Sequence, residues 1–183
     1  MNYNRILLIW RAVLACGAVL SLAACAMSAA PERMIVAQTA SGAPFPQPFR
    51  QATCVRNISG GEETNPLWTS KVGNAEFSQA LASSLQNAQL LGVEGSCRYF
   101  VDVTLLGISQ PTFGANMEVI AHANYKVYNA AGKPILLDTE TASYTASFSE
   151  SLIGVERLRR ANEGAIRTAT AQFLEKFRGV SSF

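Results

Sequence analysis

The 183-residue sequence has a single histidine, His122. A serine or cysteine triad would have to use it, and the motifs G-x-S-x-G, Walker A, H-E-x-x-H and C-x-x-C are all missing. His122 lies between polar neighbours on a predicted strand, which is more typical of a surface histidine than of a base or a ligand. The adjacent carboxylates Glu62 and Glu63 are typical of solvated loop residues. We therefore expect no enzyme, no cofactor and no metal site.

The sequence also lacks the excess of positive charge that attracts nucleic acid. Its formal net charge is +2, and Arg5 and Arg11 both lie within the first 24 residues. If those 24 are removed from the 183 as a targeting signal, the remaining 159 residues carry no net charge. We therefore expect no nucleic-acid partner.

The N-terminus has the pattern of a secretory signal in residues 1–24. Arg5 and Arg11 precede an apolar run over residues 12–21, and residues 22–25 read Leu-Ala-Ala-Cys. These four residues resemble the lipobox of bacterial lipoproteins, in which the cysteine is acylated with fatty acids such as palmitate. An ordinary signal peptide and an uncleaved anchor are the alternatives, although Arg11 disfavours a spanning helix of about 20 apolar residues. We predict that Cys25 carries a lipid and anchors the protein to a membrane.

The segment from Cys25 to residue 51 is rich in proline and alanine, which predicts an extended tether before a single domain at residues 52–183. Its one apolar island, residues 34–36, is short enough to dock on the domain as a stray strand. Ala26 follows the cysteine at a position where an aspartate favours inner-membrane retention in enterobacteria. By that resemblance we expect the periplasmic face of the outer membrane.

Two cysteines remain besides Cys25 after removal of the signal, namely Cys54 and Cys97. An even pair in an oxidising compartment predicts a disulfide. Closing a loop of this length stabilises a fold by about 4 kcal/mol in the chain-entropy model. A zinc site is the rival interpretation, but two thiols and one histidine are a poor ligand set.

Apolar periodicity predicts an α+β fold. Two segments have apolar residues at helical spacing, and four have alternating or β-branched patterns. Both helices are one-sided and need an apolar surface, which a sheet with one buried face supplies. We predict a two-layer sandwich of order β-α-β-β-β-α, with two helices on one face of a mainly antiparallel sheet. The strands are expected at residues 52–58, 99–108, 117–128 and 135–146, and the helices at 74–91 and 152–178; the last strand is expected at an edge.

Two regions are candidates for binding a partner. The loop 60–70 contains Leu67 and Trp68, which either contact a partner or plug the open end of the core. The sheet face turned away from the helices would expose more apolar surface than a monomer normally does. Either the tether or a terminal segment covers this face, or it binds a protein or lipid. The apolar residues expected on that face are Phe100, Leu106, Ile108, Ile120 and Tyr128.

The second predicted helix contains the only local cluster of basic residues, at 157–160. Arg157 and Arg160 are either ordinary solvated side chains on the polar face of the helix or contacts to anionic headgroups or lipopolysaccharide phosphates. We expect Arg159, Asn162 and Glu163 to tie this helix to the loop 60–70, which is a structural role.

The runs Gly-Gly-x-x-Thr-Asn-Pro-Leu-Trp-Thr-Ser at residues 60–70 and Glu-Arg-Leu-Arg-x-Ala-Asn-Glu-Gly-Ala-Ile-Arg at 156–167 resemble a family of uncharacterised proteobacterial lipoproteins. That resemblance implies no assigned activity. The architecture distantly resembles envelope-assembly lipoproteins and the auxiliary lipoproteins of lipid-transporting ABC systems. We expect a non-catalytic, lipid-anchored periplasmic adaptor with an envelope protein as partner. The alternative is a lipid or glycolipid handler of an ABC-type or lipopolysaccharide transport system.

Overall fold

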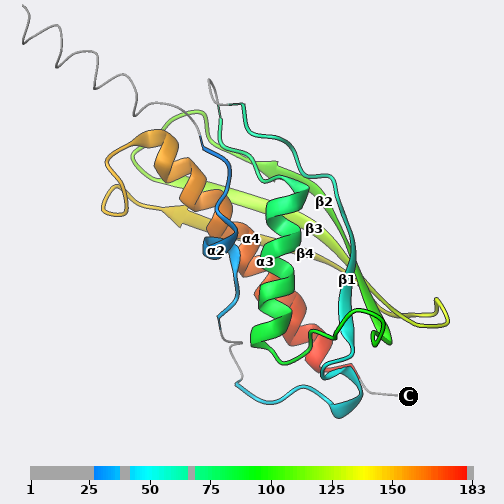
Figure 1. The fold of residues 1–183 in the computed structure, drawn as a ribbon. Coiled ribbons are helices and arrows are strands. Elements are labelled where there is room, and N and C mark those ends of the chain that lie inside the picture. The colour runs from blue at the N-terminus through cyan, green and yellow to red at the C-terminus, as the bar shows by residue number, and fades with distance from the viewer. Residues whose placement is uncertain (1–26, 38–41, 66–68, 181–183) are drawn as a thin grey trace, which may run out of the picture.

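The computed structural model describes residues 27–37, 42–65 and 69–180. A four-stranded sheet of order β1-β2-β3-β4 is covered on one face by two long helices, α3 and α4 (Figure 1). β1 runs parallel to β2, whereas the other two pairings are antiparallel. The predicted α+β two-layer sandwich is therefore confirmed. The elements are β1 (Thr53–Ser59), α3 (Asn74–Asn87), β2 (Tyr99–Ser109), β3 (Met117–Asn129), β4 (Pro134–Ala146) and α4 (Gly154–Arg178).

Alternation along the strands separates a buried face from an open one. Every second residue of β3 from Met117 to Val127 is buried, because successive side chains of a strand point to opposite faces. The helices bury their apolar stripes on this same face, where α4 contacts β3 and β4 and α3 contacts β1. β1 and β4 form the two edges of the sheet, as expected for the last strand.

Close contacts join α4 to the sheet. The ring of Tyr125 stacks on that of Phe173 with centroids 4.5 Å apart. The hydroxyls of Tyr125 and Thr170 lie 3.1 Å apart, and burial raises the pKa of the tyrosine, which keeps it neutral. Gly164 allows the close approach of α4 to β4, because a Cβ there would overlap the ring of Tyr144. These contacts fix α4 against the sheet.

A β-bulge in β2 corrects one predicted position. The pairing with β3 shifts between Leu105 and Gly107, so that Ile108 pairs with Ala121 on the helix side. Ile108 packs against the core, although simple alternation placed it on the open face. Leu106 lies in the bulge and is 59% exposed. One extra residue thus reverses the facing of the side chains that follow it.

The predicted tether is wrong for the residues that the structure describes before β1. This N-terminal segment, residues 27–37 and 42–51, contains α2 (Pro31–Met34) and a 3-10 helix (Gln47–Phe49). α2 contacts both α3 and α4 and lies on the helix side of the sheet (Figure 1). The proline-rich composition suppresses long helices and strands, but it does not prevent the apolar side chains between the prolines from packing. The buried ones are Met34, Val36, Phe45 and Phe49.

The helices are shorter than predicted at one end each. α3 ends at Asn87 rather than at residue 91, because Gln89, with φ of 59°, takes the left-handed conformation that commonly ends a helix. α4 begins at Gly154 rather than at residue 152. Among the described residues, neither these helices nor any other is sufficiently long and apolar to cross a membrane.

A disulfide links Cys54 in β1 to Cys97, just before β2, across a sequence separation of 43 residues. The predicted pairing is confirmed, and the zinc alternative is wrong because both sulfurs are bonded to each other. The bond joins the edge strand to the chain that leads into the centre of the sheet.

Candidate functional site

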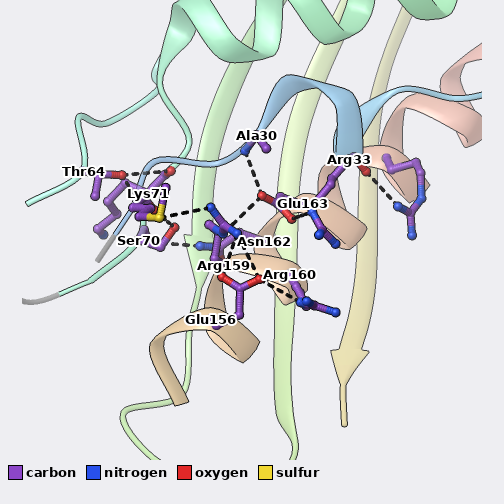
Figure 2. A network of polar contacts seen from close by, with 12 residues as sticks. Ala30, Arg33, Thr64, Ser70, Lys71, Glu156, Arg159, Arg160, Asn162 and Glu163 are labelled. Carbon is purple, nitrogen blue, oxygen red and sulfur yellow. Dashed lines mark hydrogen bonds and ion pairs between the residues drawn. The ribbon is translucent and has the colours of Figure 1, made fainter. Parts of the chain in front are cut away.

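The beginning of the N-terminal segment is fixed to α4 through the buried side chain of Asn162 (Figure 2). Asn162 Nδ2 donates to Ser70 O at 2.9 Å, and Asn162 Oδ1 accepts from Gln110 Nε2 at 2.7 Å. Ser70 Oγ in turn donates to Met27 O at 2.7 Å. The expected tie between α4 and the loop 60–70 is confirmed at Asn162. It extends to the chain at Met27.

Glu163, the residue after Asn162 in α4, holds the same segment at Ala30. It is 1% exposed, and its Oε1 accepts a hydrogen bond from Ala30 N at 2.8 Å. Arg33 Nε and Arg159 Nε each lie 3.7 Å from a carboxylate oxygen of Glu163. Burial raises the pKa of Glu163, and the backbone bond and the two guanidinium groups reduce this shift without reversing it. Glu163 is therefore a structural residue, as expected, but it holds the N-terminal segment rather than the loop.

Further hydrogen bonds continue the attachment along both helices. Ser84 Oγ of α3 accepts from Val36 N at 2.9 Å, and Asn87 Nδ2 donates to Val36 O at 3.2 Å. Arg167 Nη1 of α4 donates to Arg33 O at 2.7 Å. Because side chains of two helices satisfy its backbone groups, the N-terminal segment is part of the folded body.

Arg157 corrects a predicted surface site. It is 5% exposed, and its guanidinium donates to Ser151 O at 2.8 Å and to Gly114 O at 3.1 Å. The same group lies 4.7 Å from the ring centroid of Phe148. Arg157 thus joins the β2–β3 loop to the β4–α4 loop, and is not available to bind a headgroup or a partner. An isolated helix pattern cannot reveal that two loops fold over one of its charged positions.

The remaining basic residues of the cluster are paired. Arg160 Nε and Glu156 Oε1 lie 2.9 Å apart, and Arg159 Nη2 lies 2.7 Å from Glu156 Oε2. Burial acts to raise the pKa of Glu156, but the hydrogen bonds from both arginines outweigh it and lower the pKa. The predicted basic patch is largely neutralised, and Arg160 keeps only part of its surface free for a partner.

The open face of the sheet presents three of the apolar residues that were expected there. Phe100, Ile120 and Tyr128 are all half-buried, and none of them belongs to the core. Leu137 of β4, opposite Lys126, is 60% exposed on the same face. The described part of the N-terminal segment lies against the helices instead, so it does not cover this face.

An arginine and two aromatic rings form the main cluster on the open face. The guanidinium of Arg56 lies 4.8 Å from the ring centroid of Tyr128 and 5.9 Å from that of Phe100. Arg56 Nε donates to Asp102 Oδ1 at 2.9 Å, and this side-chain bond raises the pKa of Arg56. Arg56 was not among the predicted site residues. Alternation along β1 would have placed it on the open face, because it lies two residues after Cys54, which pairs with Phe100. We call Arg56, Phe100, Asp102 and Tyr128 the aromatic cluster.

His122 lies further along the open face. Its Nδ1 is 2.9 Å from Thr141 Oγ1, a cross-strand contact with a hydroxyl. In the part of the chain that the structure describes, no group of three or more histidine, cysteine or acidic side chains is arranged to hold a metal ion.

A hollow of about 620 Å³ lies beside the disulfide. It is bordered by β1 at Val55 and Arg56, by Ala82 of α3 and by Phe100 of β2. Its volume is within the range of small-molecule sites, about 300–1,000 Å³. Local sequence patterns cannot reveal this hollow, because it depends on how α3 is placed against the edge strand.

Three predicted site residues, Cys25, Leu67 and Trp68, lie outside the described residues. Next to the latter two, Asn65 and Thr69 form an isolated β-bridge, and Thr64 Oγ1 accepts from Lys71 N at 2.8 Å. The two sides of the loop 60–70 are therefore held together close to these residues.

Comparison with known proteins gives structural relatives only. No family model and no curated protein matches the sequence. Among 28 matching solved chains is a hypothetical protein from Chlamydia trachomatis, with a TM-score of 0.51 and 12% identity over 72% of this chain and 97% of that one. A Xanthomonas campestris protein of family DUF330 has a TM-score of 0.48 and 11% identity over 74% of this chain and 91% of that one. A minor lipoprotein from Acinetobacter baumannii has a TM-score of 0.43 and 10% identity over 70% of this chain and 93% of that one.

The likeness to the Chlamydia protein shows that the fold occurs elsewhere in bacteria. Several of the other neighbours are described as lipoproteins, from Acinetobacter and Neisseria among others. At such identities a shared fold does not carry over an activity.

Proposed function

We propose that this protein is a lipid-anchored, non-catalytic binding module of the bacterial cell envelope. A lipid on Cys25 attaches it to the periplasmic face of the outer membrane, and the open sheet face binds another envelope protein. The observation that carries this proposal is the aromatic cluster, which lies on a face that neither the helices nor the described N-terminal segment cover.

The composition of the cluster supports a protein partner. Tyrosine, phenylalanine and arginine are enriched in protein interfaces, where they supply most of the binding energy. The ion pair with Asp102 and the stacking on two rings hold the Arg56 side chain in one position, which reduces the entropy that binding would cost. Further across the same face, the polar side chains of Asn124 in β3 and Thr139 in β4 are joined by a hydrogen bond of 2.8 Å.

The surroundings of His122 support a non-catalytic role. Its contact is the hydroxyl of Thr141 rather than a carboxylate that would orient it as a base. A test is complementation of a deletion strain with His122→Ala. Full complementation is expected. A complete loss, in a variant that is still folded and still binds the partner of the parent chain, would argue for an enzyme.

The partner is tested by crosslinking in intact envelopes, followed by purification of the full-length protein and mass spectrometry of proteins and lipids. A single dominant protein is expected with the parent chain and with the control Gln172→Ser, which changes an exposed residue of α4 on the helix side of the sheet. The double variant Phe100→Ser/Tyr128→Ser should lose it. Retention of the same protein by the double variant would remove the open face from the proposal, and Trp68→Ala then tests the loop 60–70.

The alternative is a carrier of lipid or glycolipid, and the hollow beside the disulfide favours it. Ala82 borders this hollow, so Ala82→Phe should fill it. Co-purified lipid that is lost in Ala82→Phe, with no stable protein partner, would support the carrier. Lipid that is unaffected by this variant would count against it. Arg157, one of the two residues considered for contact with anionic headgroups, is buried elsewhere.

A further inference from the structure

Large apolar side chains are exposed on two loops at one end of the molecule. Phe113 in the β2–β3 loop is 86% exposed, and Leu152 in the β4–α4 loop is 75% exposed. Phe148 and Ile153, also in the second loop, are about half exposed. Single exposed apolar residues are common in proteins, but four on two adjacent loops form a patch that calls for an explanation.

The contacts of Arg157 hold the two loops together. Its donated bonds to Gly114 O and Ser151 O span from one loop to the other. Its guanidinium also covers one face of the Phe148 ring. The loops are therefore fixed relative to α4, and the four side chains share one end of the fold.

Met27 is held at this same end. Asn162 and Gln110 connect the end of β2 to Ser70, and Ser70 binds the Met27 carbonyl. Figure 1 shows the start of the described chain beside the start of α4 and the β2–β3 loop. Met27 is itself 62% exposed, which adds a fifth apolar side chain.

Position 25 lies only two residues before Met27. Two residues span at most about 7 Å even when fully extended. The proposed lipid on Cys25 would therefore hold the bilayer surface within about that distance of Met27, at the end that carries Phe113 and Leu152.

We propose that Met27, Phe113, Phe148, Leu152 and Ile153, the anchor-side end, insert into the headgroup–acyl boundary of the membrane that holds the lipid. This inference rests on the proposed function. Apolar side chains of interfacial segments reach about 5–10 Å into that boundary. The protein would then stand on the membrane in one orientation rather than move on a tether.

The charges of the two loops agree with this location. In residues 110–116 and 147–153 the only charged residue is Glu150. Its carboxylate accepts hydrogen bonds from Tyr144 Oη at 3.2 Å and Ser147 N at 3.0 Å, which offsets part of its desolvation cost. No unpaired charge would thus have to leave water along with the apolar side chains of these loops.

The test uses the full-length protein, expressed in bacteria, purified from membranes and reconstituted into vesicles that contain brominated phospholipid. Tryptophan is introduced singly as Phe113→Trp or Leu152→Trp at the anchor-side end. Val93→Trp and Leu137→Trp are matched controls, because both positions are exposed but lie before β2 and on the open face. Each emission spectrum is read as the difference from the parent chain, and circular dichroism checks the fold.

The reporters at positions 113 and 152 should shift to shorter wavelength and lose emission to the brominated lipid, whereas those at 93 and 137 should not. Equal behaviour of all four would overturn the membrane contact and leave this end to a protein partner. The mass of the purified chain reports lipidation separately. Quenching at 113 and 152 without lipid on Cys25 would refute the anchor while supporting the contact.

Discussion

Asn162→Asp replaces one atom in the connection between α4 and the N-terminal segment. The nitrogen that donates to Ser70 O at 2.9 Å becomes an oxygen facing a carbonyl oxygen at the same distance. A protonated carboxyl group can still donate that bond. An ionised one cannot, and it keeps only the hydrogen bond from Gln110 Nε2 to offset the cost of its burial. The fold therefore raises the pKa of the introduced aspartate above its ordinary value of about 3.9.

The magnitude follows from linkage. If the fold raises this pKa by about 2 units, the variant loses about 2.7 kcal/mol of unfolding free energy at neutral pH. The sign is set by protonation: below the unfolded-state pKa both states are neutral and the loss is small. As the pH rises above about 4 the unfolded state ionises first, so the loss grows until the folded state ionises as well.

The assay is urea denaturation of the parent and the variant at about pH 4 and about pH 7, read as a difference at each pH. Asn124→Asp makes the same change on the half-exposed sheet face and should cost less than about 0.5 kcal/mol at both values. A loss for Asn162→Asp that does not grow with pH would refute the account of this hydrogen bond.

Three further predictions use the same denaturation assay. Arg157→Met removes two hydrogen bonds to loop carbonyls and should lower the unfolding free energy by about 2 kcal/mol or more. Its control, Arg160→Met, removes a partly exposed ion pair and should lower it by less than about 1 kcal/mol. Equal losses would contradict the buried role of Arg157. Gly164→Ala forces a Cβ into a tyrosine ring and should cost about 1–3 kcal/mol, so a neutral result would contradict the close approach of α4. Replacing both Cys54 and Cys97 by serine should cost about 4 kcal/mol, and an unchanged midpoint would show that the disulfide does not constrain the unfolded chain.

Sequence periodicity was sufficient for the layers and the order of the elements. The helix stripes and the alternation in β3 depend on local spacing, which is visible without tertiary contacts. The pairing of Cys54 with Cys97 followed from counting cysteines. Phe100 is on the open face because the alternation of β2 is regular before the bulge, and Ile120 and Tyr128 are there because the alternation of β3 is regular.

The errors arose where long-range contacts override local pattern. A bulge at Leu106 turned Ile108 inward, and nothing in the local alternation marks it. Arg157 is buried because two loops close over it, and the carbonyl that it reaches in the β2–β3 loop, that of Gly114, lies 43 residues away in the sequence. The N-terminal segment has the composition of a linker, yet its few apolar side chains dock on α3 and α4.

These corrections change the picture of how the protein would be presented. A docked segment replaces a flexible tether, so an anchored body would hold the aromatic cluster in one direction relative to the membrane. A partner that binds this cluster would then have to reach the open sheet face from the side. This arrangement restricts the partner to proteins located close to the same membrane.

The most direct measurement of the central claim is site-specific photocrosslinking in living cells. A photoreactive amino acid replaces Tyr128 on the open face and, as a control, Gln172, which is exposed on α4. The account predicts one dominant protein adduct from position 128 and no such adduct from position 172. No adduct at position 128, or the same adducts from both positions, would contradict a binding site on the open sheet face.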